Sequence, residues 1–391
     1  MNALEQLLQL PEEEKLRTGI VYTPGEIAQQ PRTWRQTFEL FRQRCQEISE
    51  FLAGAGVKTG SHEKPMVLLV GAGSSDYVGR SLVSLLRRRW NCEVVACPST
   101  DLVLHYADIL RPQQPYLCIS FSRSGDSPEG VAVIKKVLHS RPDVHHVVVT
   151  CNREGQMMQQ VEGRKQALAI CLDESVNDRG LAMTSSFSNM VVLGHCLAHI
   201  DDPQAYAEIV GRLAETAEKF LPMAANTAAD LANGEYERAC FVGTGTLRAV
   251  AQECALKLLE LTAGRRQTMS ESTLGLRHGP MAALDQQTLF VSFLSSDDRI
   301  RAYEQDLLKE IGSKRLVKTR IAIGGLSTVE LDGWAENLLP SNSSVPDDYR
   351  APIDVMFGQV LGLFSSLRCG LKPDSPSPSG AISRVVQNVR F

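Results

Sequence analysis

Two segments of the chain combine an apolar run, a turn rich in glycine and serine, and the start of a helix. They are VLLVGAGSSDYVG at 67–79 and YLCISFSRSGDSPEG at 116–130. Gly71 and Gly73 allow the backbone to turn tightly and to approach a ligand closely. The unpaired N–H groups and the dipole at the start of the following helix attract an anion. Together the two segments predict one phosphate cradle.

The predicted ligands of this cradle are five hydroxyl groups, those of Ser74, Ser75, Ser122, Ser124 and Ser127. Ser127 is followed by Pro128 and Glu129, which is a typical helix opening with an N-cap serine. A dinucleotide fold would need a third glycine where the chain has Asp76, and the Gly-Lys-Ser/Thr ending of a nucleotide P-loop is also missing. The pattern therefore indicates a small phosphorylated metabolite, with an ordinary strand-to-helix turn as the alternative.

The order of apolar runs predicts two parallel-sheet domains. Helical periodicity dominates the first part of the chain, and from Met66 short apolar runs alternate with amphipathic helices. A second series begins with ACFVGTGTLRAVAQECALKLLEL, which repeats the order of strand, G-x-G turn and helix. We therefore expect two tandem, doubly wound, flavodoxin-like α/β domains with flanking helices. Their expected bounds are a helical segment at 1–48, a first domain at 49–215, a second domain at 216–370, and a tail at 371–391 that closes over the site.

Composition argues against several other classes of protein. The chain has 41 Lys and Arg residues against 45 Asp and Glu residues, and the net charge of −4 gives no broad footprint for nucleic acid. No apolar stretch approaches the roughly 20 residues that span a bilayer, and the N-terminus lacks the pattern of a signal peptide. The 10 cysteines form no CxxC pair. We therefore expect a cytoplasmic protein without nucleic-acid or membrane partners.

Three charged residues supply a second signal. Glu253, Lys257 and Glu260 recur at i, i+4 and i+7 on a predicted helix. At about 100° per residue, these side chains lie within about 60° of one another. One interpretation is an exposed stripe of ion pairs, which stabilises a helix by only a few tenths of a kcal/mol. The leucines that crowd Glu260 favour the other interpretation, a partly buried carboxyl group that moves protons.

Histidines supply a third signal. His278 lies in the segment SESTLGLRHGP, which ends at Pro280 and is expected to form a polar loop. A loop histidine beside Gly-Pro points to function more than a core histidine does, although an incidental position is the alternative. His195 and His199 stand at i, i+4 and could ligate zinc, but neither a third ligand nor an HExxH glutamate is evident. We therefore expect no metal.

Taken together, these motifs resemble those of the sugar isomerase (SIS) family. That family pairs a G-x-G-(S/T)-S turn with an S-x-S-G-(D/E)-(S/T) loop, as in 71–75 and 122–127. The tandem arrangement is similar to the isomerase half of glucosamine-6-phosphate synthase, whose A-L-K-L-x-E helix and H-G-P loop match 255–260 and 278–280. The SES-x-LG-x-RHGP stretch, the MTSSFSNM segment at 183–190 and the C-terminal tail most resemble the AgaS-type group of galactosamine-6-phosphate deaminases/isomerases.

The resemblance implies a role for each site residue. The implied phosphate-binding residues are Gly73, Ser74, Ser75, Ser122, Arg123, Ser124 and Ser127. Glu260 is implied to move a proton between C2 and C1, and His278 to assist opening of the sugar ring. Lys257 and Arg384 are implied to stabilise developing negative charge. Arg384 stands where the synthase has a Schiff-base lysine, and a guanidinium is a poor imine-former.

The implied reaction converts galactosamine 6-phosphate to tagatose 6-phosphate and ammonia, without a metal or an organic cofactor. The sequence contains no glutaminase domain, which favours release of ammonia over its installation. The family also implies a homodimer or a higher homo-oligomer in which the histidine reaches the site of a neighbouring subunit. Two alternatives stay open, a plain aldose–ketose isomerase and a non-catalytic sugar-phosphate sensor, and so does the choice between galacto and gluco sugars.

Overall fold

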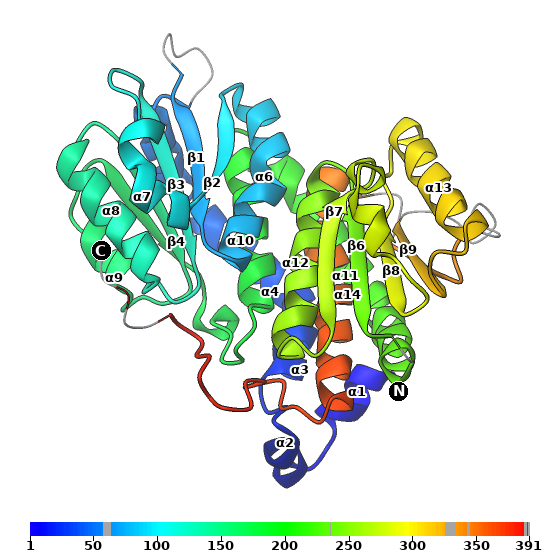
Figure 1. Cartoon of the computed structure of the whole chain (residues 1–391). Helices are drawn as coiled ribbons and strands as arrows, with labels where there is room; N and C mark the ends of the chain where they lie inside the picture. The colour runs from blue at the N-terminus through cyan, green and yellow to red at the C-terminus, as the bar shows by residue number, and fades with distance from the viewer. Residues whose placement is uncertain (58–63, 235, 325–333, 342–344, 387–388, 390–391) are drawn as a thin grey trace. The chain divides into compact units, whose positions relative to one another are not determined.

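The computed structural model describes residues 1–57, 64–234, 236–324, 334–341, 345–386 and 389. These residues form two compact units, each built on one parallel sheet (Figure 1). The first-sheet unit comprises Arg32–Asp178, Ser185–Val210 and Ser383–Phe391, and the second-sheet unit comprises Met1–Pro31, Arg179–Thr184 and Gly211–Ile382. The predicted fold class of two doubly wound α/β domains is confirmed. The predicted domain bounds stay a prediction.

The first sheet has five parallel strands in the order β2-β1-β3-β4-β5. They are β1 (Met66–Gly71), β2 (Val94–Pro98), β3 (Tyr116–Ser122), β4 (His145–Thr150) and β5 (Ala167–Cys171). Every side chain of β3 is buried, as expected for a strand covered by helices on both faces. The strand order reverses between β1 and β3, and the crevice outside their carboxyl ends is the usual ligand position in open α/β sheets.

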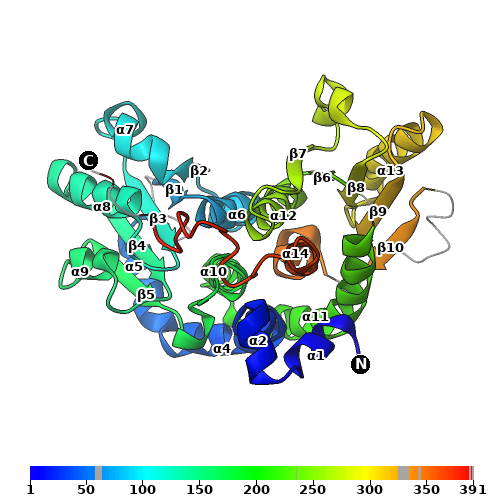
Figure 2. The same cartoon turned by 60° about the horizontal axis from the view of Figure 1, so that its bottom comes forward.

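Helices cover both faces of the first sheet (Figure 2). One face carries α7 (Ser99–Ile109), α8 (Pro128–Ser140) and α9 (Gln156–Val161), and the other carries α6 (Ser74–Trp90) and α10 (Ser185–Ala198). Leu68 and Val70 of β1 belong to one buried cluster with side chains of α7 and α8. Leu69, which lies between them, points to the opposite face, where any side chain at Gly79 of α6 would meet it. The alternation is that of a strand, with a period of two residues.

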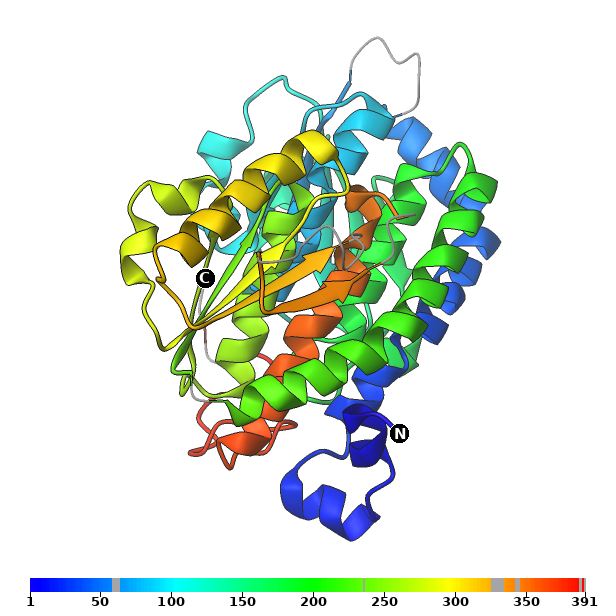
Figure 3. The same ribbon diagram turned by 90° about the vertical axis from the view of Figure 1, so that its right-hand side faces the viewer.

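The second sheet repeats this architecture, with the order β10-β9-β8-β6-β7. Its strands are β6 (Arg238–Gly243), β7 (Gln267–Ser272), β8 (Thr288–Phe293), β9 (Thr319–Gly324) and β10 (Asn337–Pro340). One face carries α13 (Asp298–Ser313), which lies nearest the viewer in Figure 3, and the other carries α12 (Thr246–Leu261) and α14 (Asp347–Arg368). Leu307 and Ile311 of α13 pack against Val242 and Phe290 of the sheet.

The other helices are mostly short. They are α1 (Ala3–Leu8), α2 (Glu12–Thr18), α3 (Thr23–Ala28), α4 (Gln30–Gln43), α5 (Cys45–Gly54), α11 (Pro203–Asn233) and the 3-10 turns η1 (Glu174–Val176), η2 (Gly275–Arg277) and η3 (Pro280–Ala283). No helix in these described ranges is long and apolar enough to cross a membrane.

Two strands of the second sheet were not expected from the sequence. β7 has the sequence QTMSES, and its side chains are only partly buried at the sheet edge, so it lacks an apolar run. Part of the expected polar loop SESTLGLRHGP is therefore the end of a strand. β10 is only four residues long and ends in Pro340, which is a weak pattern for any prediction.

Candidate active site

The first predicted turn follows β1 in the first-sheet unit. A Cβ atom at Gly71 would lie 2.3 Å from the carbonyl carbon of Ser75, so only glycine lets the chain reverse here. Gly73 has φ 56° and ψ −127°, a conformation that side chains strongly disfavour, and α6 begins at the next residue. Ser74, Ser75 and Asp76 follow in the first helical turn, and all three are buried. Burial raises the pKa of the Asp76 carboxyl, although Arg80 pairs with it at 2.7 Å and opposes the rise.

The second predicted loop follows β3, and its hydroxyl groups organise its own backbone. The Ser122 hydroxyl accepts a hydrogen bond from Gly125 N (3.1 Å), and the Ser124 hydroxyl accepts one from Asp126 N (3.1 Å). Ser127 caps α8 by accepting from Gly130 N (3.4 Å), and it donates to the Glu129 carboxylate (3.1 Å). A hydroxyl that accepts keeps its proton. The Ser122 and Ser124 hydroxyls can therefore still donate a hydrogen bond, and their role in binding phosphate stays a prediction.

Contacts with the next strand-to-helix connection hold this loop in place. Gly125 has φ 67°, and a Cβ atom there would lie 3.1 Å from both Gly155 Cα and Thr150 Oγ1. Asp126 accepts a hydrogen bond from Gln156 N at 2.9 Å. The loop is thus rigid before any ligand arrives, which lowers the entropic cost of binding.

The two segments meet at a small cavity of about 30 Å³ at the carboxyl ends of β1 and β3, which we call the serine crevice. Ser75, Ser122 and Ser127 line it, whereas Ser74, Ser124, Gly73 and Arg123 do not. Two further hydroxyl residues line it that the sequence motifs did not indicate, Ser99 and Ser120. Ser120 is an interior residue of β3, and Ser99 follows β2, so neither belongs to a glycine-containing turn.

Arg384 lies beside the second loop in the same unit. Arg123, which is buried, donates a hydrogen bond to the backbone oxygen of Arg384 at 3.0 Å. The Arg384 guanidinium in turn donates to the side-chain oxygen of Asn177. The structure therefore brings Arg384 to the carboxyl end of the first sheet, next to one of the predicted phosphate-binding residues.

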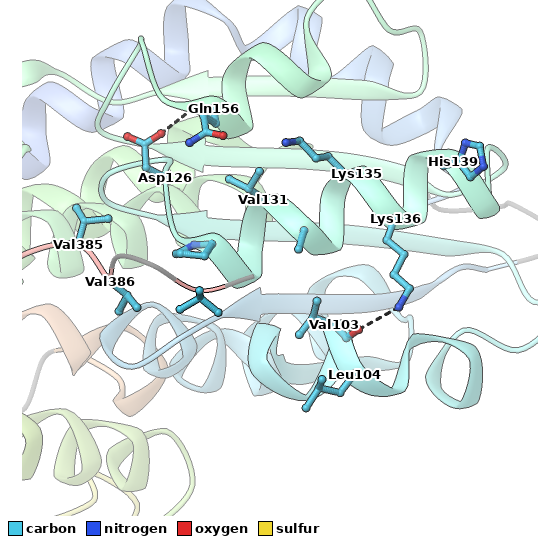
Figure 4. Close-up of a pocket in the computed structure, with 13 residues that line it drawn as sticks. Val103, Leu104, Asp126, Val131, Lys135, Lys136, His139, Gln156, Val385 and Val386 are labelled. Carbon is cyan, nitrogen blue, oxygen red and sulfur yellow. Dashed lines mark hydrogen bonds between the residues drawn. The ribbon is translucent and has the colours of Figure 1, made fainter. Parts of the chain in front are cut away.

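A larger hollow of about 1080 Å³ lies on the α7–α8 side of the same unit (Figure 4). Apolar side chains such as Val103 and Val131, the cationic Lys135, and the tail residues Val385 and Val386 line it. None of the five predicted phosphate-binding hydroxyl residues lines this hollow. We therefore regard the serine crevice as the candidate phosphate site.

The charged residues of α12 form a network in the second-sheet unit, but they are not an exposed stripe. Lys257 Nζ lies 2.6 Å from Glu260 Oε2 and 3.4 Å from Glu253 Oε1. Lys257 and Glu253 have no exposed side-chain surface, whereas the Glu260 side chain is 31% exposed. The reason is the close approach of α14, where a Cβ at Gly358 would lie 2.5 Å from Cys254 Sγ. The arrangement leaves one carboxylate accessible and held by a buried ammonium group.

His278 lies in the same unit, on the connection after β7. Its side chain is exposed. The connection is held in place just before it, because Leu276 is buried and Arg277 Nε donates to Glu310 Oε2 at 2.6 Å. A rigid loop that presents an exposed imidazole is suited to proton transfer on a ligand.

The other histidine pair lies in the protein interior. His195 Nδ1 is 3.1 Å from the Tyr206 hydroxyl, and His199 Nδ1 is 3.2 Å from an Arg89 nitrogen. Burial lowers the pKa of His199 to about 4. Within the described ranges, no three His, Cys, Asp or Glu side chains gather closely enough to hold a metal ion. The expectation that no metal takes part stays a prediction.

Comparison with known proteins defines the class of protein. No protein-family model matches the chain. A solved structure from Clostridium novyi NT has a TM-score of 0.91 and is 31% identical over 96% of both chains. The tagatose-6-phosphate ketose/aldose isomerase of Escherichia coli has a TM-score of 0.83, with 31% identity over 91% of this chain and 95% of that one. With its two parallel sheets and serine-lined turn, the chain is a sugar isomerase (SIS) protein, which confirms the resemblance.

A curated relative narrows the class to a family. The D-galactosamine-6-phosphate deaminase AgaS of Escherichia coli is 34% identical over 373 residues, which is 94% of each chain. The chain belongs to the AgaS family of D-galactosamine-6-phosphate deaminases.

Proposed function

We propose that this protein is a deaminating isomerase that converts galactosamine 6-phosphate to tagatose 6-phosphate and ammonia. The observation that carries the proposal is the 34% identity to a D-galactosamine-6-phosphate deaminase over 94% of both chains. The serine-lined turn of the first-sheet unit and the accessible Glu260 of α12 supply groups that such a reaction needs.

In the proposed reaction, the serine hydroxyls and the nearby helix N-termini hold the phosphate. His278 moves a proton between the C1 hydroxyl and the ring oxygen, which opens the ring. The Glu260 carboxylate removes the C2 proton to give an enolamine and returns a proton to C1, so that C2 becomes an imine carbon. Water adds to the imine and ammonia leaves, which yields the ketose. Lys257 and Arg384 stabilise the negative charge that develops during proton transfer.

The buried position of Lys257 supports the role of Glu260. An ammonium group without access to water loses its solvation and must be compensated by carboxylates. The 2.6 Å contact therefore holds the Glu260 carboxyl group in one orientation, which suits a catalytic base. In contrast, a protein that only senses a sugar phosphate has no need of a fixed base.

The proposed enzyme is a homodimer or a higher homo-oligomer, in which His278 serves the site of a neighbouring subunit. The support for this proposal is the exposed His278 side chain on a rigid loop. Mixing two inactive variants, His278→Ala and Glu260→Gln, tests it. Mixed oligomers would regain part of the activity if the two residues belong to different subunits in one site, and would stay inactive if both come from one chain. We also propose a cytoplasmic location, which suits 10 cysteines that are all free.

A second candidate function is aldose–ketose isomerisation of a neutral sugar phosphate, because one relative at 31% identity is named a tagatose-6-phosphate ketose/aldose isomerase. Ammonia release from galactosamine 6-phosphate, with glucosamine 6-phosphate assayed in parallel, separates the two. Ammonia from the galacto sugar supports the deaminase. No ammonia from either sugar, together with interconversion of neutral sugar phosphates, would establish the isomerase instead.

A further inference from the structure

Ser99 is a buried serine whose hydroxyl group has no role in the fold. It follows β2 and is the first residue of α7, and only 1% of its surface is exposed. Its Oγ atom is buried and makes no hydrogen bond within the described part of the chain. It does not cap α7, because Pro98 holds the N-cap position and no side chain caps this helix. A buried hydroxyl without a partner destabilises a protein, so its presence calls for another explanation.

The position of Ser99 in the wall of the serine crevice indicates a role in binding a ligand. Ser99 lines the serine crevice together with Ser75 and Ser122. Strand pairing accounts for this position, because Pro98 lies opposite Gly71 in the β1–β2 register, and Ser99 therefore emerges beside the glycine turn. The crevice of about 30 Å³ has room for one oxygen-sized group. Serines that follow or end three strands therefore line one small space.

We propose that Ser99 is a further phosphate-binding residue, whose hydroxyl donates a hydrogen bond to the phosphate oxygen that occupies the serine crevice. The inference rests on the proposed sugar-phosphate function and adds a third strand end to its binding site. A serine hydroxyl that is unpaired in the free protein is fully available as a donor, because no internal bond has to break when the ligand binds. Hydrogen bonds to a charged acceptor are also the stronger kind.

The variant Ser99→Ala tests this proposal, because the stability of the free protein and the binding of the sugar phosphate should change in opposite directions. The ligand-free variant should be at least as stable as the wild type, because a methyl group replaces an unpaired hydroxyl. The KM for galactosamine 6-phosphate should rise by roughly 10- to 100-fold, with kcat little changed, as expected for one lost bond to a charged group. Thermal stabilisation by inorganic phosphate should fall in the same variant. Ser99→Cys, which keeps the size but donates weakly, should also raise KM.

Two controls make the result specific. Ser127→Ala should lower the stability of the free protein, because Ser127 caps α8. Ser140→Ala, at the exposed end of α8, should leave KM unchanged. A Ser99→Ala protein with the wild-type KM, or one less stable than the wild type, would overturn the proposal, since the hydroxyl would then be idle or structural. A wild type that binds no sugar phosphate would instead overturn the proposed function itself. A wild type that binds it, with an unaffected Ser99→Ala variant, would overturn only the proposal for Ser99.

Discussion

Gly73 and Gly245 have the same backbone conformation, although they belong to different units. Gly73 has φ 56° and ψ −127°, and Gly245 has φ 58° and ψ −126°. Each is the last residue before the helix that follows the first strand of its sheet along the chain, β1 or β6. The glycine two positions earlier also behaves alike in both turns, since a Cβ atom would lie 2.3 Å from backbone atoms at Gly71 and at Gly243. The sequences Gly-Ala-Gly at 71–73 and Gly-Thr-Gly at 243–245 therefore form the same type of turn.

The loops that face these turns are not alike. In the second sheet, the loop after β8 uses its backbone N–H groups on carboxylates of its own unit. Ser295 N donates to Glu304 Oε2 at 2.7 Å, and Ser296 N donates to Asp347 Oδ1 at 2.8 Å. Two carboxyl groups thus occupy the backbone N–H groups of this loop, whereas the loop after β3 has serine hydroxyls. We therefore expect phosphate to bind in the first-sheet unit alone.

The first prediction compares the two glycines directly. Gly73→Ala and Gly245→Ala should each lower the free energy of unfolding by about 1–3 kcal/mol, because alanine is strained at this φ and ψ. Only Gly73→Ala should also weaken binding of galactosamine 6-phosphate. Denaturation curves and calorimetric titration of both variants measure the two effects. Equal loss of binding in both variants would contradict this prediction, because it would show that the turn at Gly245 also contributes to substrate binding.

The second prediction concerns Ser124, which does not line the serine crevice but belongs to the same loop as Ser122, and whose hydroxyl accepts a hydrogen bond from Asp126 N. Ser124→Ala should raise KM by an amount equivalent to about 1–3 kcal/mol, with a smaller effect on kcat. Steady-state kinetics give the answer, with Ser140→Ala as the control on the exposed surface. An unchanged KM would remove Ser124 from the phosphate site.

The third prediction concerns the buried Lys257. Lys257→Met should lower the free energy of unfolding by about 3–5 kcal/mol, because the buried Glu253 carboxylate would lose the ammonium group that lies 3.4 Å away. The double variant Lys257→Met with Glu253→Gln should recover much of that loss, since it removes both charges. Urea unfolding of the two variants checks the difference. A double variant as unstable as the single one would mean that packing, rather than charge, is responsible.

The fold was largely predictable from the sequence, and the reason is visible in the strands. The runs around Val67–Val70 and Leu117–Ile119 are apolar because helices cover both faces, so each run marks a strand by itself. β7 was missed because it lies at the sheet edge and exposes polar side chains. Prediction thus succeeded where burial dictates the residue type and failed where it does not.

The candidate site was only partly predictable, for a different reason. The glycine turns identify Ser75, Ser122 and Ser127, because such turns have a local sequence pattern. Ser99 has no such pattern, and its position depends on the register between β1 and β2. The burial of Lys257 likewise depends on the distant α14, so the spacing on α12 alone could not separate an exposed stripe from a buried network.

The fourth prediction is a pH dependence of stability that arises from Glu304. Burial raises the pKa of this carboxyl to about 7 from an ordinary 4.5, and the negative charge of Asp347 adds to the rise. The Ser295 N–H, the Thr244 hydroxyl and the Arg350 charge act in the opposite direction. Between these two pH values the unfolded chain releases the proton and the folded chain keeps it. The stability that the protonated carboxyl provides is therefore full below pH 4.5 and is lost as the pH rises through about 7.

The loss from this one group should be on the order of 3 kcal/mol. In Glu304→Gln, which cannot ionise, the free energy of unfolding should fall less between pH 5 and pH 8, and the variant should be the more stable protein at the higher pH. Chemical denaturation at both pH values measures this. Glu237→Gln, on the exposed surface of the same unit, is the matched control. If the free energy of unfolding depends on pH in the same way in the wild type and in Glu304→Gln, the Glu304 carboxyl group is not the source of the pH dependence.

The fifth prediction concerns Glu260, the proposed base. Glu260→Gln keeps the shape of the side chain but removes the carboxylate, so kcat should fall by roughly 10²–10⁴-fold, the usual contribution of general acid–base catalysis. KM should change little, because the proposed phosphate site belongs to the first-sheet unit. Lys257 stays paired with Glu253 in this variant, so loss of activity cannot be assigned to an unpaired buried lysine. The decisive measurement is exchange of the C2 proton of the substrate with deuterated solvent. Exchange at the wild-type rate in Glu260→Gln would show that another group is the base, and would reduce Glu260 to the partner that neutralises Lys257.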